Sequence, residues 1–125
     1  MKTIKQKYKM NASIEKVFDA LTNPKVIEIW SGSKAKMSAK EGAKFELWGG
    51  DMFGKNLQVV KNKKLVQEWC PSSFKSIATF IIKKKGEKSE VELIHENVPA
   101  KSHKNYSDGW RDYYLGPMQQ MFEEK

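Results

Sequence analysis

The chain has 125 residues, 39% hydrophobic and 30% charged, a balance that fits one globular domain and excludes a disordered chain. Its 23 lysine and arginine residues exceed its 15 acidic residues, and the net charge of +8 favours an acidic partner over a basic one. Cys70 is the single cysteine, which excludes an internal disulfide and a cysteine-based zinc site.

The basic residues are almost all lysine, with Arg111 the only arginine. Base readout relies on arginine forks, so specific nucleic-acid binding is not expected. A solvated lysine surface is the first interpretation of this charge, and an acidic protein is the preferred partner if the charge has one. No apolar run approaches the ~20 residues of a membrane span. Because Met1–Lys9 is polar with no apolar segment after it, no secretory signal is predicted and a cytoplasmic location is expected.

The first predicted elements are one strand and two short helices. Thr3–Met10 alternates larger apolar or neutral residues with lysines, the period-two pattern of a strand with one buried face. Ser13 is a suitable N-cap for a helix whose apolar residues follow at helical spacing as far as Leu21. Asn23-Pro24 ends this helix and begins a second one, which Ser31-Gly32-Ser33 stops.

A series of about six antiparallel strands is predicted next. The strand segments are a short basic stretch at 34–40, the alternating stretches at 45–48, 56–59, 65–70 and 91–96, and the stretch 76–82. The stretch 76–82 is apolar on both faces and is therefore predicted to be a central strand. Turns are predicted at 49–51 together with Gly54, at Asn62 and at 85–88.

The last predicted element is a long helix over 105–122. Its apolar and aromatic residues recur at steps of three and four and form one stripe. So much aromatic area needs a large apolar partner, so we expect a curved sheet to wrap this helix in one α+β domain over residues 1–125. Gly116-Pro117 predicts a kink, because proline cannot donate the backbone hydrogen bond of the helix.

Several short segments together resemble one known family. In chain order they are 18–24, Ile29-Trp30-Ser31, 33–45, Gly54-Lys55, 65–69, Val98-Pro99, Gly109-Trp110 and Tyr113-Tyr114. From about Ile14 to Phe122 the chain is similar to the C-terminal domain of the activator of Hsp90 ATPase, the Aha1-like family. The resemblance implies a helix-grip fold of the START-like, Bet v 1-like superfamily. That fold has two short helices after the first strand and about six or seven antiparallel strands around the last helix.

The same resemblance implies a function without catalysis. Aha1-like proteins have no cofactor and no recognised catalytic residues, and they are associated with binding Hsp90 and stimulating its ATPase. The family's eukaryotic activators carry a further N-terminal domain, to which the resemblance does not extend. Members of the wider superfamily often hold an apolar ligand between the sheet and the long helix. A carrier or sensor of a small hydrophobic ligand is therefore the alternative function.

Two sets of candidate site residues follow. The expected lining of a ligand cavity consists of Phe45, Trp69, Phe80, His95, Trp110, Tyr114 and Met118. The expected partner surface consists of Lys34, Lys36 and Lys40, which share one strand parity, with Lys44 on the neighbouring strand. A charged edge strand that discourages aggregation is the alternative interpretation of these lysines.

Support for an enzyme or a metal site is weak. His95 is expected on the inward face of its strand, where it is either a general base in a cavity or a hydrogen-bonded core histidine. His103 lies in a lysine-rich loop, and the two histidines have no acidic cluster with metal-ligand spacing. We therefore expect no catalytic residues, no metal and no cofactor.

Overall fold

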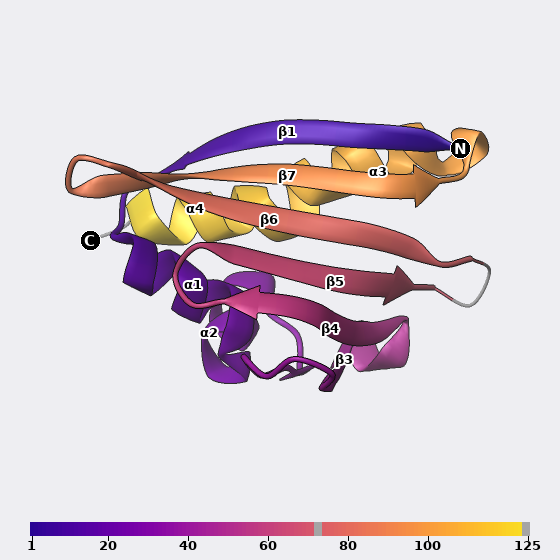
Figure 1. The fold of residues 1–125 in the computed structure, drawn as a ribbon, viewed down its shortest axis with the longest axis horizontal. Helices are drawn as coiled ribbons and strands as arrows, with labels where there is room; N and C mark the ends of the chain where they lie inside the picture. Colours follow the sequence, from indigo (N-terminus) through magenta and orange to yellow (C-terminus); the bar gives the residue numbers. More distant parts are fainter. Residues whose placement is uncertain (72–73, 124–125) are drawn as a thin grey trace.

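The computed structural model describes residues 1–71 and 74–123, and Figure 1 shows their arrangement. The chain begins with strand β1 (Lys2–Met10) and continues into helices α1 (Ile14–Thr22) and α2 (Pro24–Ser31). Six strands follow: β2 (Ala35–Lys36), β3 (Lys44–Leu47), β4 (Met52–Val60), β5 (Lys64–Cys70), β6 (Ser76–Lys85) and β7 (Lys88–Val98). A short 3₁₀ segment, η1 (Trp48–Gly50), connects β3 to β4.

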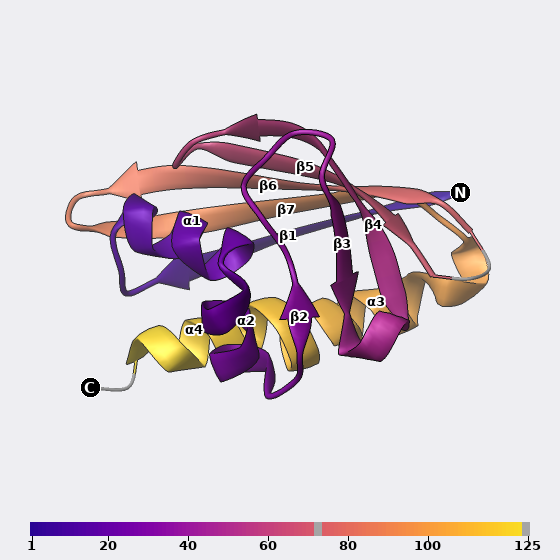
Figure 2. The same cartoon turned by 90° about the horizontal axis from the view of Figure 1, so that it is seen from below.

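The C-terminal helical region has four consecutive parts. They are a 3₁₀ turn, η2 (Ala100–Ser102), helix α3 (His103–Gly109), a π-helical turn, η3 (Trp110–Tyr114), and helix α4 (Leu115–Glu123). The seven strands form one antiparallel sheet in the order β1-β7-β6-β5-β4-β3-β2. Figure 2 shows this sheet curving over the C-terminal helical region, with α1 and α2 near the α4 end of that region. The predicted helix-grip architecture is confirmed.

Local signals explain the first two helices. The Ser13 side chain accepts a hydrogen bond from the backbone nitrogen of Lys16 at 3.3 Å, as an N-cap does. Asn23 caps α2 by accepting from Lys25 at 3.0 Å, with Pro24 at the first helical position. Gly32 then ends the helix in a left-handed conformation, with φ of 73°.

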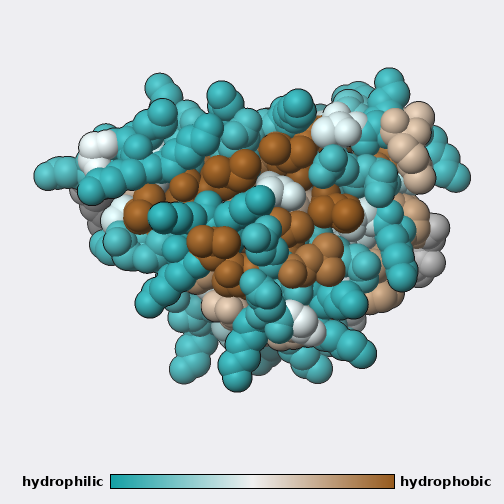
Figure 3. All heavy atoms as spheres, in the orientation of Figure 1, coloured by the Kyte–Doolittle hydropathy of each residue, from teal (hydrophilic) through white to brown (hydrophobic). Residues whose placement is uncertain are grey.

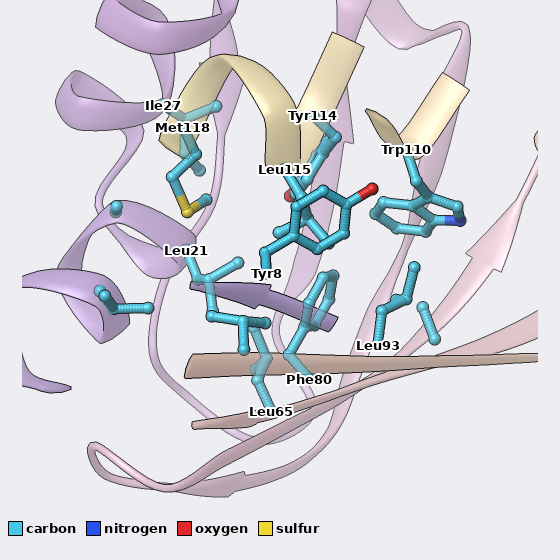
Figure 4. Packing of buried hydrophobic residues seen from close by; sticks show 14 of the residues in the cluster. Tyr8, Leu21, Ile27, Leu65, Phe80, Leu93, Trp110, Tyr114, Leu115 and Met118 are labelled. Carbon is cyan, nitrogen blue, oxygen red and sulfur yellow. The ribbon is translucent and has the colours of Figure 1, made fainter. Parts of the chain in front are cut away.

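The core lies between the sheet and the C-terminal helical region. Most inward-facing residues of β1, β3, β5, β6 and β7 are buried, as the period-two pattern predicts, whereas β2 has no buried residue and β4 alternates less regularly. Figure 4 shows helix residues Trp110, Tyr114, Leu115 and Met118 projecting toward sheet residues Leu65, Phe80 and Leu93. Burying each of these large side chains stabilises the fold by about 1.5–3 kcal/mol relative to leaving it exposed.

The outer face of the sheet combines an apolar stripe with charged borders. Figure 3, in the orientation of Figure 1, shows apolar residues gathered along the middle of this face with hydrophilic side chains around them. Ile77, Ile81 and Ile94 are half-buried there, whereas their inward-facing neighbours are fully buried. Beside them, Lys83 Nζ lies 3.3 Å from Glu92 Oε1. Among the described residues, no helix has the length and hydropathy needed to cross a membrane.

Two strand predictions were wrong in detail. The strand predicted over 34–40 contains only Ala35–Lys36, because the carbonyls of Ser38 and Lys40 accept hydrogen bonds from the Asn56 side chain instead of from a strand. Gly54 is inside β4 rather than in a turn. It faces inward between the rings of Phe45 and Trp69, whose centroids are 5.8 Å apart.

The last helix starts at His103, two residues before its predicted start, and is irregular before its proline. The π-helical turn η3 is followed directly by α4, whose second and third residues are Gly116-Pro117, where a kink was predicted. A Cβ on Gly116 would lie 1.7 Å from the Arg111 carbonyl oxygen, so only glycine fits against this turn. Because Pro117 has no N–H to donate, a regular α-helical ladder could not be completed here in any case.

Candidate functional site

A cleft of about 580 Å³ opens between the C-terminal helical region and the end of the sheet that carries η1. Its lining is largely aromatic and comprises Trp48, Asp51, Met52, Trp69, Pro71, Asn105, Tyr106, Gly109, Trp110, Tyr113 and Tyr114. A concave site of this size, apolar with a few polar groups, has the dimensions and chemistry of small-molecule sites in proteins.

The residues predicted to line a cavity occupy two different layers. Trp69, Trp110 and Tyr114 line the cleft. Phe45, Phe80, His95 and Met118 face the same side of the sheet or helix, but each is fully buried in the core and lies outside the cleft lining. Strand parity identifies the face on which a side chain lies and does not give its depth, so the sequence pattern could not separate the two layers.

Sequence reasoning missed the wall of the cleft that η1 supplies. Trp48 has φ of 52°, a left-handed conformation that is unusual for a bulky residue, and it is followed by Gly49 and Gly50 at 67° and 95°. This local geometry places the half-buried Trp48 indole against the rings of Trp69 and Tyr114, at centroid distances of 6.4 and 6.2 Å. The glycine pair signalled a turn, but nothing in the pattern indicated where the tryptophan would point.

His95 is completely buried, and both of its ring nitrogens have partners. The Trp110 indole N–H donates to His95 Nδ1 at 3.0 Å, which makes Nδ1 the acceptor and places the proton on Nε2. The Nε2–H then donates to Ser76 Oγ at 2.8 Å, and the Ser76 hydroxyl donates to the Trp69 carbonyl at 2.9 Å. Burial lowers the pKa of His95 from 6.5 to about 4.

This hydrogen-bond chain makes His95 a positioning residue. The bond from Trp110 to His95 fixes the indole on its buried side, and the bond from His95 to Ser76 keeps the neutral imidazole in one tautomer. A general base needs a nitrogen that can reach a substrate proton, and both nitrogens here are engaged in the core. The geometry is that of a hydrogen-bonded core histidine, the second of the two interpretations of this residue.

A second hydrogen-bond chain connects the cleft to the loop at 37–40. The Trp69 indole N–H donates to Gln67 Oε1 at 2.9 Å, and Gln67 Nε2 donates to Asn56 Oδ1 at 2.9 Å. Asn56 Nδ2 donates in turn to the carbonyls of Ser38 at 2.8 Å and Lys40 at 2.9 Å. Asn56 and Gln67 are buried, and these bonds satisfy their amide groups in the core.

The four predicted partner-binding lysines are all exposed, but they do not share one strand face. Because β2 is so short, Lys34 and Lys40 lie in loop segments. Lys36 is on β2 and forms an exposed ion pair with Glu46, with Nζ and Oε2 3.3 Å apart. Lys44 is the direct cross-strand neighbour of Lys55 on β4. The described residues contain no group of three potential metal ligands.

The hydroxyl of Tyr114 is buried and has no hydrogen-bond partner within the described part of the chain. Its ring packs against the rings of Trp30, Trp48, Trp69, Phe80 and Trp110. Burial raises the pKa of this phenol, so it is neutral and can donate one hydrogen bond. A buried polar group without a partner is uncommon in folded proteins and calls for an explanation.

The family model described as Activator of Hsp90 ATPase homolog 1-like protein matches residues 11–123, which is most of the chain. The chain belongs to this family. Activator of 90 kDa heat shock protein ATPase homolog 1 from Homo sapiens is 26% identical over 115 residues, covering 88% of this chain and 34% of the human protein. An uncharacterised protein from Schizosaccharomyces pombe is 24% identical, covering 95% of this chain and 37% of its own length. The chain thus spans about a third of these relatives.

Solved structures of this family and its neighbours share the fold. The crystal structure of an HSP90 activator from Plasmodium falciparum superposes with a TM-score of 0.88 at 23% identity, covering 97% of this chain and 96% of that one. The solution structure of an Aha1 dimer from Colwellia psychrerythraea gives a TM-score of 0.86 at 18% identity, covering 98% and 97% of the two chains. At these identities the likeness establishes the helix-grip architecture of the family.

Proposed function

We propose that this protein is a non-enzymatic Aha1-like domain that binds an Hsp90-family chaperone in the cytoplasm and favours its ATPase-competent conformation. The observation that carries the proposal is membership of the activator family along residues 11–123. Curated relatives from Homo sapiens, Mus musculus and Dictyostelium discoideum are named as activators of the 90 kDa heat shock protein ATPase or their homologues. The domain would act by binding, since an ATPase is stimulated when one of its conformations is bound more tightly than another.

The charge distribution supports an acidic partner surface. Lys34, Lys40 and Lys44 are exposed, and the loop that holds Lys40 is anchored to the core through Asn56. Lys44 faces Lys55 directly across two strands, and opposed like charges destabilise a sheet. Glu68 lies opposite Lys55 on β5, and a carboxylate on a partner would supply a counter-charge for Lys44. An acidic surface would therefore gain both long-range attraction and a local contact.

The first test changes charge on the proposed surface. Replacing Lys34, Lys36 and Lys40 with glutamate is expected to abolish binding to the cognate chaperone and stimulation of its ATPase at low salt. The matched control replaces Lys61, Lys84 and Lys88, which are exposed in the β4–β5 and β6–β7 hairpin regions, with the same change in net charge. The measurement is ATP turnover of the chaperone together with binding at low and physiological salt. If both triple variants lose binding and stimulation, the proposed surface is wrong. If the original protein itself does not stimulate the chaperone ATPase, the proposed function is wrong.

The cleft favours a second function, as a carrier or sensor of a small apolar ligand. The supporting observations are its volume of about 580 Å³, its aromatic lining and the Tyr114 hydroxyl without a partner. Because this hydroxyl is buried, a ligand in the cleft would accept its hydrogen bond only if the neighbouring rings moved apart. This function is compatible with chaperone binding, because the cleft is lined by aromatic residues and the proposed partner lysines lie outside that lining.

Removing the Tyr114 hydroxyl tests this second function. For Tyr114→Phe we expect a free energy of unfolding that is unchanged or raised by up to ~1 kcal/mol without ligand, since an unpaired buried hydroxyl contributes only a desolvation cost. Native mass spectrometry of freshly purified protein is expected to show a copurifying small molecule, with lower occupancy in the variant. A clear loss of stability in Tyr114→Phe would reveal a hidden hydrogen bond and remove this support for a ligand.

A further inference from the structure

The aromatic cleft differs in charge from the other concave parts of the surface. Three other concavities are each bordered by three lysines: Lys44, Lys55 and Lys75; Lys9, Lys85 and Lys88; and Lys63, Lys64 and Lys84. The first also contains Glu68 and the second Glu90 and Glu123, so lysines outnumber carboxylates in all three. The described lining of the aromatic cleft contains no lysine and no arginine, and its one carboxylate is Asp51. In a chain with a net charge of +8, this is a local reversal of sign.

The aromatic rings of the cleft are inclined to one another and do not form a parallel stack. Trp48 meets Trp69 at an interplanar angle of 70° and Tyr114 at 75°. Trp69 and Trp110 are tilted by 45°, with centroids 4.7 Å apart. The faces of aromatic rings carry negative electrostatic potential, so a concavity with several rings at different angles attracts cations, and tryptophan is the most effective of the aromatic residues.

Segment η1 and the residue after it place an aromatic ring and a carboxylate on the same rim of the cleft. Trp48 holds a left-handed backbone conformation with φ of 52°, which costs of order 1–3 kcal/mol for a bulky residue. Asn62 and Asn97 are the other described non-glycine residues with positive φ, and asparagine tolerates that conformation. Three residues after Trp48 comes the exposed Asp51, also in the cleft lining. Strain of this kind clusters at binding sites, where the surrounding structure holds it.

From these observations we propose that the cleft binds an organic cation, a substituted ammonium group attached to an apolar body. The cationic group lies against the Trp48 indole near the Asp51 carboxylate, and the apolar body lies deeper, among Trp69, Trp110 and Tyr114. This assignment rests on the second proposed function, that of a ligand cleft, and names its ligand class. It is independent of chaperone binding.

The test compares the binding of an organic cation with that of an uncharged molecule of the same shape. Benzyltrimethylammonium is the cationic probe, and neopentylbenzene, which has carbon in place of the ammonium nitrogen, is the neutral isostere. Binding is measured by quenching of tryptophan fluorescence and by shifts of the indole N–H signals in NMR spectra. We expect the cation to bind roughly ten-fold or more tightly than the isostere, since a desolvated cation–π contact contributes ~2 kcal/mol.

Two variants locate the interaction. Asp51→Asn is expected to weaken cation binding roughly three-fold, the size of a partly exposed ion pair, and to leave the isostere unaffected. Glu87→Gln is the matched control: it makes the same change in net charge in the exposed β6–β7 turn, and its affinity should equal that of the original protein. Trp48→Leu keeps an apolar side chain without the ring, and we expect about ten-fold weaker cation binding.

The outcomes separate this inference from the function on which it rests. Equal affinity for the cation and the isostere overturns the cation assignment and leaves an apolar ligand cleft. Binding of neither probe overturns the ligand cleft as well. Cation binding that neither Asp51→Asn nor Trp48→Leu weakens overturns the assignment too, because the cation would then bind elsewhere. Circular dichroism of each variant confirms that folding is retained, and Asp51→Asn changes only an exposed side chain.

Discussion

Replacing Gly54 with alanine is expected to lower the free energy of unfolding by about 3 kcal/mol, the upper end of the range for overpacking. A Cβ at this position would lie 1.7 Å from the Glu68 carbonyl oxygen and 3.1 Å from Cε2 of Phe45. The first contact is with the backbone of the neighbouring strand, which cannot turn aside as a flexible side chain can. The sheet would have to open between β4 and β5, and overpacking of this kind is among the most damaging single changes in a core.

Urea unfolding followed by tryptophan fluorescence measures this effect, and Gly109→Ala is its matched control. Gly109 has helical dihedral angles, and a Cβ there would meet nothing within 4 Å. The same added methyl group should therefore leave stability unchanged or raise it by about 0.5–1 kcal/mol. A Gly54→Ala protein as stable as the original would mean that β4 and β5 do not approach each other as closely as described.

On acidification from pH 7 to pH 4, His95 is expected to remove about 3 kcal/mol from the free energy of unfolding. The folded-state pKa of His95 is about 4 and its ordinary value is 6.5. Between these values the unfolded chain binds a proton that the folded protein does not, so stability falls as the pH falls. The loss begins below about pH 6.5 and is complete near pH 4, where the folded histidine also becomes charged and its hydrogen bond from Trp110 breaks.

Two histidine variants isolate this contribution from the carboxylates that titrate in the same range. His95→Gln is expected to be less stable at pH 7 by about 1–3 kcal/mol, because the Trp110 N–H loses its acceptor. Its stability should nevertheless fall less between pH 7 and pH 4, so the two curves converge. His103→Asn, which changes the other histidine, should follow the original curve. Parallel curves for His95→Gln and the original protein would contradict the buried neutral state.

The parts of the fold that could be predicted depend on local chemistry. The caps at Ser13 and Asn23, the alternation in β1 and β5, and the turns at Asn62 and Gly86 each depend on a few neighbouring residues. The elements that were predicted wrongly are those in which contacts between distant residues outweigh the local sequence preference. Asn56 is polar and lies within a strand, so nothing near it in sequence indicated that it would be buried and would hold the loop at 38–40 out of the sheet.

The cleft was predictable only in part for the same physical reason. The apolar stripe of the last helix identified Trp110 and Tyr114, and strand alternation identified Trp69. The opposite wall depends on the left-handed conformation of Trp48, whose indole packs against rings from two distant segments, Trp69 on β5 and Tyr114 in η3. A pattern of residue types carries no record of such packing, so Trp48 and Asp51 could be assigned only from the structure.

The position of β1 in the sheet has a consequence for the order in which the protein folds. Its one sheet neighbour is β7, which it meets from Lys2 opposite Val98 to Met10 opposite Ser89, so the first strand of this sheet along the chain pairs with the last. Until the ribosome has released β7, β1 has no strand beside it, and such distant pairing slows folding. The lysines along β1 give this strand a charged face before it pairs with β7, which discourages pairing with other nascent chains.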